Sequence, residues 1–273
     1  MKFSAGIIFL SGISVATPLT KERQIANFGR SLARVSYQHR SNPPFVARNV
    51  WGPLELNNTR ATVQYSTNWA GAVLIGSGYT SVTGVFTVPV PSLPQGSDTS
   101  NTQYCASAWV GVDGDTCQTA ILQTGVDFCI QNNRSSYIAW YEWYPDYAYD
   151  FDEVSISAGD KIRVTVMATS NSTGVATVEN LTNGDYGLHE FTKQSDQLCQ
   201  TNAEWIVEDF QVGSELVPFA DFGTITFTNA TAVRNGIMVD TTGAQILDIK
   251  RKNILYTSYS ASGNTVTIAY VAK

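Results

Sequence analysis

The chain has 273 residues and a net charge of −6, and 43% of its residues are hydrophobic, which is enough for a sizeable core in one or two domains. Residues 17–60 hold seven Lys and Arg against two Asp and Glu, a net of +5, whereas residues 61–273 hold nine against twenty-one, a net of −12. The acidic body argues against nucleic acid as a partner, and no apolar run is long enough for a membrane span.

The first 60 residues have the pattern of a secreted precursor. Lys2, the apolar run 7–10 and the small residues 14–16 predict a signal peptide over residues 1–16; an N-terminal strand is the alternative. Residues 17–60 predict a basic propeptide that lies on the acidic body, with a disordered tail as the alternative. Helical spacing of Ile25, Phe28, Leu32 and Val35 gives this segment one apolar face. The mature chain is expected to begin between Ala61 and Ser66.

A secreted, extracellular location agrees with two other features. Four cysteines, an even number, suit two disulfides. Five Asn-x-Ser/Thr sequons predict that the protein carries some N-linked glycans, and they begin at Asn57, Asn133, Asn171, Asn180 and Asn229.

Beyond residue 60 the sequence alternates between apolar and polar residues in short runs separated by turn signals. Three sets of apolar residues are each expected on one face of a strand: Val82, Phe86, Val88 and Val90; Ile162, Val164 and Val166; and Val266, Ile268 and Tyr270. No helix of more than two turns is expected. Residues 61–273 therefore predict one all-β domain, a β-sandwich or a barrel.

A hairpin is expected around the turn Asp113-Gly-Asp115. If residues 105–113 pair with 121–129, Cys105 faces Cys129 and a disulfide between them is plausible. In this register Gln123 faces Gly111, Trp109 faces Gly125 and Ser107 faces Asp127, all on one side of the sheet. That face, with large side chains opposite glycines, is more typical of the floor of a cleft than of a dry core.

Two later segments repeat the alternation. Trp140, Glu142 and Tyr144 share one strand face, and Glu204, Ile206, Glu208 and Phe210 share another. From spacing alone the glutamates also fit an ordinary solvated face and the aromatic residues a core. The residues by themselves indicate a polar and aromatic groove.

Several chemistries are excluded by what the body lacks. His189 is its single histidine, is expected at the surface, and has no His-x-x-x-His partner, so no zinc peptidase motif is present. No Gly-x-Ser-x-Gly elbow and no Gly-rich phosphate loop occur, and Asp240-Thr-Thr-Gly misses the aspartic peptidase motif by one residue. All four cysteines are interpreted as structural. No metal and no cofactor are expected.

Six stretches of the body strongly resemble the glutamic peptidases, or eqolisins, which are secreted acid endopeptidases known mainly from fungi. The matching stretches are Asn68–Gly71, Trp109–Asp127, Ala139–Pro145, Glu179–Thr182, Cys199–Phe210 and Val217–Ala220. They occur in the family's order and together span nearly the whole body. One departure is Ile138, where an aspartate is expected.

The resemblance implies a sandwich of two curved antiparallel sheets, similar to concanavalin-like lectins and glucanases. It implies that Gln123 and Glu208 form the catalytic dyad. Positions matching that family's cleft or its support are Trp69, Trp109, Asp113, Asp127, Trp140, Glu142 and Tyr144. A disulfide between Cys117 and Cys199 is also implied, which leaves Cys105 to pair with Cys129.

The expected function is that of a monomeric acid endopeptidase that cleaves proteins or peptides, with its own propeptide as an intramolecular inhibitor. Glu208 is expected to activate a water molecule and Gln123 to stabilise the oxyanion, without a covalent intermediate. Two alternatives use the same fold. One is a glycoside hydrolase with Glu142 and Glu208 as its carboxylates, and the other is a carbohydrate-binding module with an aromatic platform.

Overall fold

The computed structural model describes residues 39–44, 46–53, 62–97 and 101–273, all of which belong to one compact unit that begins at Tyr37. The predicted signal peptide and the helix-spaced residues 25–35 lie outside the described residues. The described part of the predicted propeptide, 39–44 and 46–53, forms strands and a short extended stretch. Within these described ranges there is no helix, and none that could cross a membrane.

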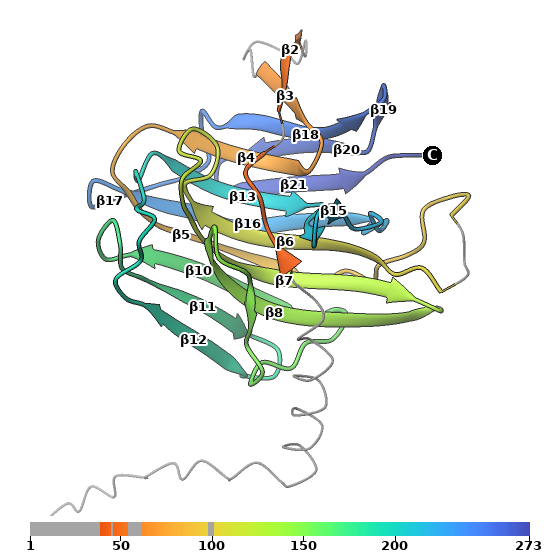
Figure 1. Ribbon diagram of the computed structural model, residues 1–273, viewed down its shortest axis with the longest axis horizontal. Coiled ribbons are helices and arrows are strands. Elements are labelled where there is room, and N and C mark those ends of the chain that lie inside the picture. Colours follow the sequence, from red (N-terminus) through yellow and green to blue (C-terminus); the bar gives the residue numbers. More distant parts are fainter. Residues whose placement is uncertain (1–38, 45, 54–61, 98–100) are drawn as a thin grey trace, which may run out of the picture. The chain divides into compact units, whose positions relative to one another are not determined.

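The larger sheet has ten strands and carries the residues predicted for the site (Figure 1). Its strands, in spatial order, are β2 (Val46–Pro53), β3 (Thr62–Ser66), β18 (Gln245–Arg251), β4 (Trp69–Ile75), β13 (Asn202–Glu208), β6 (Tyr104–Val112), β7 (Ile121–Gln131), β8 (Arg134–Tyr144) and β9 (Tyr149–Asp150), and β19 (Ile254–Leu255) pairs with β18. All of these pairs are antiparallel except that of β3 with β18.

The second sheet has eight strands, and a small third sheet has three. The order in the second is β12 (Tyr186–Phe191), β11 (Gly174–Asn180), β10 (Lys161–Ala168), β5 (Tyr79–Thr87), β16 (Thr224–Arg234), β21 (Thr265–Tyr270) and β20 (Thr257–Ser262), and β17 (Ile237–Val239) pairs with β16. The third consists of β1 (His39–Arg40), β14 (Gln211–Val212) and β15 (Glu215–Leu216).

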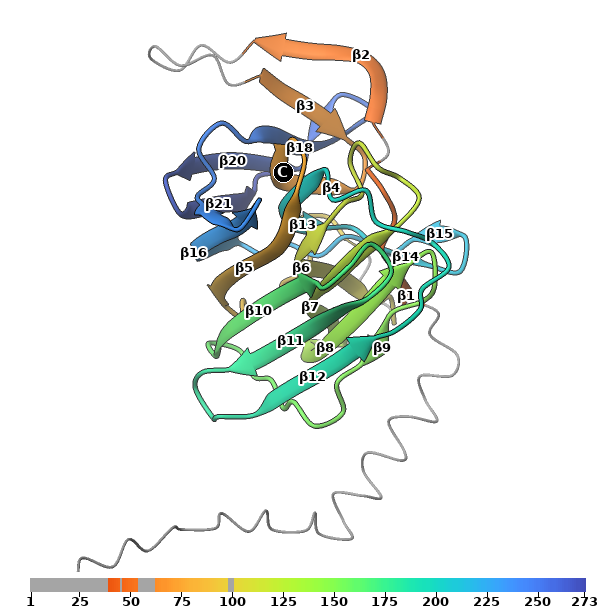
Figure 2. The same ribbon diagram turned by 90° about the vertical axis from the view of Figure 1, so that its left-hand side faces the viewer.

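The two large sheets pack face to face as a β-sandwich, which confirms the predicted fold class (Figure 2). β10 and β11 lie over β6, β7 and β8, and the core fills the space between them. Side chains alternate along each strand, so β13 sends Ala203, Trp205 and Val207 into this core and sends its even-numbered residues to the opposite face. The outer face of the ten-stranded sheet is therefore free to carry polar groups.

The predicted hairpin register is confirmed. β6 pairs with β7 so that Cys105 lies opposite Cys129, Trp109 opposite Gly125 and Gly111 opposite Gln123. The structure joins Cys105 to Cys129 by a disulfide. A second disulfide joins Cys117 to Cys199, which are 82 positions apart in sequence.

Some predictions about individual residues were wrong. Val90 was placed in a strand face with Val82, but β5 ends at Thr87 and Val90 is 69% exposed. His189 was expected at the surface, yet it is half-buried and stacks on Tyr141 at 4.0 Å between ring centroids. The expectation that the protein carries some N-linked glycans stays a prediction. At one of the five sequons the side chain of Asn180 is buried and its Nδ2 donates hydrogen bonds to Ser155 and Asp160, so we do not expect a glycan at this position.

Candidate active site

The outer face of strands β13, β6, β7 and β8 carries three rows of side chains, which we call the polar face. Each row runs straight across the four strands, because the strand pairings are in register. The rows are Glu204, Gly111, Gln123 and Glu142; then Ile206, Trp109, Gly125 and Trp140; then Glu208, Ser107, Asp127 and Ile138. The structure thus brings Gln123 and Glu208, which are far apart in sequence, onto one surface, two rows apart.

Glu208 is held by a tryptophan on the neighbouring strand. The indole Nε1 of Trp109 donates a hydrogen bond of 2.9 Å to one carboxylate oxygen, and the backbone N–H of Asn42 donates one of 3.1 Å to the other. The side chain of Glu208 is fully buried in this state. Burial raises the pKa of Glu208 to about 7, although these hydrogen bonds and the nearby His39 act in the opposite direction.

On the polar face, Gln123 has a carboxylate on one side and a glycine, which leaves a gap, on the other. Its neighbour on β8 is Glu142, and its neighbour on β6 is Gly111, which has no side chain. Gln123 is completely buried, and neither its Oε1 nor its Nε2 has a hydrogen-bond partner in the protein. A buried amide with both ends unpaired is costly for a fold, so this group is a strong candidate for a functional role.

Glu142 is the third carboxylate of the polar face and shares its surroundings with Glu208. It is fully buried and accepts a hydrogen bond of 3.2 Å from the backbone N–H of Ser41. Burial raises its pKa well above the usual range, and the negative charge of Glu208 adds to this. Glu142 and Glu208 are therefore not both charged in acid.

Aromatic rings form the walls and floor around these groups. Trp69 packs edge-on against Trp109 at 4.8 Å between ring centroids, and Trp140 donates a hydrogen bond of 3.1 Å from Nε1 to the hydroxyl of Ser107. These three tryptophans are fully buried, and Tyr144 packs against the same cluster. The aromatic set predicted from sequence thus surrounds the carboxylates and the amide.

A segment of the predicted propeptide covers the polar face. The backbone of β1 pairs with β14, and the N–H groups of Ser41 and Asn42 point at Glu142 and Glu208. The imidazole of His39 lies 3.0 Å from the Asp127 carboxylate and packs against Trp140 and Phe210. Burial acts to lower the pKa of His39, but the charge of Asp127 raises it above the ordinary value.

Further polar contacts fix the same segment. The amide of Asn42 donates a hydrogen bond of 2.8 Å to Gln211, and the carbonyl of His39 accepts one from the N–H of Ala148. The guanidinium of Arg40 lies over the ring of Tyr147. Residues 39–42 are thus an extended peptide seated directly on the polar face.

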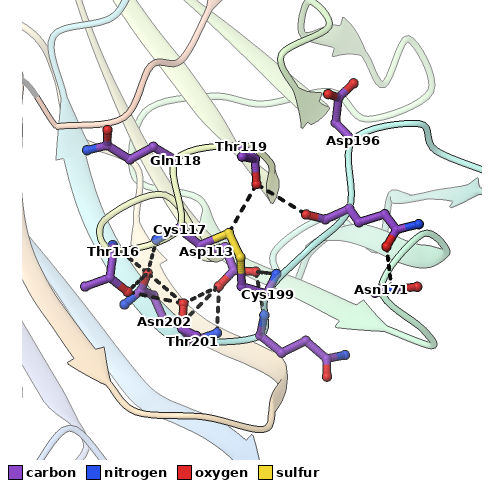
Figure 3. The surroundings of a disulfide bond; sticks show 12 residues. Asp113, Thr116, Cys117, Gln118, Thr119, Asn171, Asp196, Cys199, Thr201 and Asn202 are labelled. Atoms are coloured by element: carbon purple, nitrogen blue, oxygen red, sulfur yellow. Dashed lines mark hydrogen bonds between the residues drawn. A yellow bond between two sulfur atoms is a disulfide. The ribbon is translucent and has the colours of Figure 1, made fainter.

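Asp113 has a different place from the other predicted residues. Its two carboxylate oxygens accept hydrogen bonds of 2.7 Å from the backbone N–H groups of Cys199, Gln200 and Thr201. Figure 3 shows Asp113 with Cys199 and Thr201 beside the disulfide. Asp113 therefore anchors the segment that leads into β13, the strand of Glu208, and does not point into the polar face.

Sequence reasoning missed two groups that belong to this site. Glu204 was placed on the same strand face as Glu208 but was given no role, although it is fully buried on the row of Gln123. The contacts of His39, Ser41 and Asn42 had no sequence signal, because nothing in a sequence shows which residues meet a peptide segment more than 80 positions away. In the described part of the chain, no cluster of His, Cys, Asp and Glu has an arrangement suited to a metal ion.

Buried carboxyl groups give the fold a definite pH dependence. Burial raises the pKa of Asp115 to about 6 and that of Asp248 to about 7, as it does for Glu208. The folded state therefore binds more protons than the unfolded state between about pH 4 and 7, and stability falls as pH rises through this window. Each pKa unit corresponds to about 1.4 kcal/mol. We expect the melting temperature of the full chain to be highest near pH 4 and to fall toward neutral pH.

Thermal unfolding between about pH 3 and 8 measures this effect. Asp248→Asn should flatten the pH profile, because it removes one of the titrating carboxyls. A melting temperature that rises toward neutral pH would contradict the assignment of these groups.

Comparison with known proteins identifies close relatives. The model of the Peptidase A4 family matches residues 67–270. The chain is 51% identical to aspergillopepsin-2 of Aspergillus niger, over 99% of this chain and 100% of that protein. It is 45% identical to scytalidopepsin B of Scytalidium lignicola, over 80% of this chain and 82% of that protein.

A solved structure agrees with these matches. The crystal structure of scytalido-glutamic peptidase with a transition state analog inhibitor superposes with a TM-score of 0.69 and 43% identity, covering 75% of this chain and 98% of that one. The sandwich described above is thus similar to that of a peptidase.

Proposed function

This chain belongs to the peptidase A4 family of glutamic peptidases, and from that premise we propose that it is a secreted, monomeric acid endopeptidase in which Gln123 and Glu208 activate water. The family membership makes the chain a hydrolase of peptide bonds with protein substrates. The dyad, the acidic working range, the extracellular location and the absence of any cofactor are parts of the proposal.

One observation carries the proposal best. An extended peptide, residues 39–42, lies on the polar face with its backbone N–H groups on Glu208 and Glu142. A surface that binds peptide backbone beside a buried carboxylate is suited to bring a substrate peptide to a general base, which supports the proposal. The unpaired amide of Gln123 lies on the same face and is able to donate to a substrate carbonyl oxygen.

The proposed reaction needs no covalent bond to the enzyme. The Glu208 carboxylate holds a water molecule and removes its proton as the water attacks the scissile carbonyl carbon. Nε2 of Gln123 donates a hydrogen bond to the oxygen that becomes negatively charged. Glu208 then passes its proton to the nitrogen of the leaving amine, which returns the carboxylate to its starting state.

The raised pKa of Glu208 belongs to the covered state. Its main cause is burial, and residues 39–42 contribute to that burial. When this segment leaves, water reaches the polar face and the pKa of Glu208 falls toward its ordinary value near 4. Glu208 then becomes ionised in mild acid, as a general base must be. In the precursor it is protonated over the same pH range and cannot serve as that base.

The covering segment is proposed to be the inhibitor of the precursor. It sits on Glu208 and Glu142, where a substrate would have to bind. Protonation of Glu208 by itself favours the covered state, in which its pKa is higher, but acid also removes charge from the exposed carboxylates that give residues 61–273 their net charge of −12, and this weakens their attraction for the basic segment. Processing should therefore start when the precursor enters an acidic medium.

Replacement of His39 tests this inhibition. A hydrogen bond to a charged group is worth about 1.5–3 kcal/mol, so His39→Ala should weaken the hold of the segment by about 10- to 100-fold. We expect the variant precursor to process faster at mildly acidic pH, with a shallower dependence of the rate on pH. Gel analysis of processing between about pH 3 and 6 measures this.

The matched control is His189→Gln, since that histidine packs between the sheets, away from the polar face. Equal rates for wild type and His39→Ala would refute the role of the ion pair.

The proposed function itself is tested by digestion of a denatured protein near pH 4, followed by mass spectrometry of the products. The processed wild-type enzyme should yield many internal peptides. Release of reducing sugar from a glycan, without peptide cleavage, would overturn the proposal. The variants that assign the reaction to Glu208 and Gln123 are treated in the Discussion.

A further inference from the structure

Among the buried carboxylates of the polar face that the proposed reaction does not use, Glu204 lies on the row of Gln123 and has no contact with residues 39–42 among its hydrogen bonds. Glu204 on β13 lies opposite Gly111 of β6, and Gly111 lies opposite Gln123 of β7. Glu204 and Gln123 therefore face each other across a position that has no side chain. Both residues are completely buried.

The distances place the two side chains at the same gap. A Cβ atom added at Gly111 would lie 3.3 Å from Oε2 of Glu204 and 3.5 Å from Cβ of Gln123. In the covered state the Gln123 amide and Glu204 Oε2 are not hydrogen-bonded to each other, but the amide carbon is two bonds beyond that Cβ, so a change of rotamer would turn the amide toward Oε2. Oε2 of Glu204, like both amide atoms of Gln123, has no hydrogen-bond partner in the protein. These unpaired atoms on two adjoining side chains complement each other.

We propose that Glu204 is a positioning residue, which in the processed enzyme sets the orientation of the Gln123 amide by a hydrogen bond through Oε2. The inference rests on the proposed function, because the orientation matters only if Gln123 donates to the oxyanion. The other oxygen, Oε1, accepts a hydrogen bond of 3.2 Å from the backbone N–H of Asp115. This bond fixes the carboxyl group and leaves Oε2 at the gap beside Gln123.

The protonation state of Glu204 decides which end of the amide faces the substrate. A protonated Glu204 donates its O–H to Oε1 of Gln123, so that Nε2 is left for the substrate oxygen. An ionised Glu204 instead accepts a hydrogen bond from Nε2, and the acceptor Oε1 is then presented to the substrate. Because an oxyanion needs a donor, only the protonated form of Glu204 supports catalysis.

The surroundings of Glu204 favour the protonated form in acid. Burial raises its pKa well above the usual range, and the charges of Asp115, Asp113 and Glu208 raise it further, against the hydrogen bond from the N–H of Asp115. The charged groups that act on Glu204 are thus all carboxylates, and Glu142 approaches Gln123 from the other side, on β8. Glu204 accordingly contributes to the loss of activity as pH rises toward neutrality.

The pH dependence of kcat in the processed enzyme tests the inference through two substitutions. Glu204→Gln keeps an oxygen for the N–H of Asp115 and places an NH₂ group, a donor at every pH, beside Gln123. We expect it to keep most of kcat in acid and to move the alkaline limb of the kcat profile to higher pH. Glu204→Leu has no donor, and its kcat should fall by about tenfold or more with little change in KM.

A merely structural role for Glu204 would not move the pH profile. Melting temperatures of both variants show how much of any loss comes from the fold. Glu142→Gln is the matched comparison, since Glu142 flanks Gln123 on the opposite side. If Glu142→Gln moves the alkaline limb and Glu204→Gln leaves it in place, the inference is overturned.

Gly111→Ala provides a second, independent test of the gap. Its new Cβ would lie 2.9 Å from the ring of Trp109 as well as beside Glu204 and Gln123, so these groups must separate. We expect a drop in kcat well beyond that of Gly84→Ala, where an added Cβ meets Phe227 and Trp205 in the sandwich core at 3.1 and 3.2 Å. Equal losses in the two variants would count against the inference.

The double variant separates this inference from the proposed function. In a Gln123→Ala background, Glu204→Gln should have no further effect on the pH profile, because it acts through the amide. If Gln123→Ala keeps full activity, the proposed function fails. If Gln123→Ala is inactive but Glu204→Gln and Glu204→Leu both behave like wild type, only the positioning role fails.

Discussion

Glu208→Gln is expected to lose peptide hydrolysis, although its fold is retained. The amide has nearly the same shape as the carboxylate and is still able to accept the hydrogen bond of Trp109, but it cannot remove a proton from water or return one to the leaving amine. A general acid–base group typically contributes about 100- to 10,000-fold to a rate. Since Glu208 serves in both proton transfers, we expect kcat to fall by at least that range.

The measurement must separate catalysis from processing. The variant precursor cannot remove its own covering segment, so a trace of active wild-type enzyme is used for processing in trans and is then removed. Hydrolysis of a denatured protein near pH 4 is followed by mass spectrometry. Glu190→Gln, an exposed glutamate on β12 in the other sheet, is the matched control and should be fully active. Cleavage by processed Glu208→Gln at a wild-type rate would contradict the assignment of Glu208 as the general base.

Gln123→Ala is expected to lower kcat by about 100- to 1000-fold, the usual effect of removing one oxyanion donor. KM should change little, because the hydrogen bond forms mainly with the transition state. The substitution also removes a buried amide that has no partner in the protein, so the folded state should not be strongly destabilised.

Steady-state kinetics with a peptide substrate measure this loss, and thermal unfolding checks the fold. Gln118→Ala, in the exposed loop between β6 and β7, is the control and should behave like the wild type. A loss below about threefold for Gln123→Ala would mean that the amide gives no appreciable stabilisation to the oxyanion.

The alternation of residue types along single strands was sufficient to predict which face of the sheet carries the candidate site. Alternation along β6 and β7, with glycines opposite Trp109 and Gln123, gave the hairpin register that the structure contains. The alternation of apolar and polar residues gave a wrong prediction where a strand ends. Val90 continues the apolar alternation of Val82 and Phe86, but the chain has left β5 by then, and periodicity carries no information about where hydrogen bonding to a neighbour stops.

The remaining part of the site depends on contacts between distant segments. Nothing in the local sequence of Asp113 shows that its carboxylate binds the backbone at residues 199–201 instead of facing the polar face. Glu204 follows the same alternation as Glu208, yet only the pairing of β13 with Gly111 places it beside Gln123. The position of residues 39–42 on the polar face is likewise determined by tertiary packing.

The disulfide between Cys117 and Cys199 has a consequence for a protease that works among copies of itself. It closes a covalent ring that contains β7, β8, β9, β10, β11 and β12, and its two cysteines are 82 positions apart along the chain. A single cut in any loop of this ring opens it but releases no fragment, because the pieces on both sides stay joined through sulfur. A single self-inflicted nick between those cysteines therefore leaves the molecule in one piece until a reductant reaches the bridge.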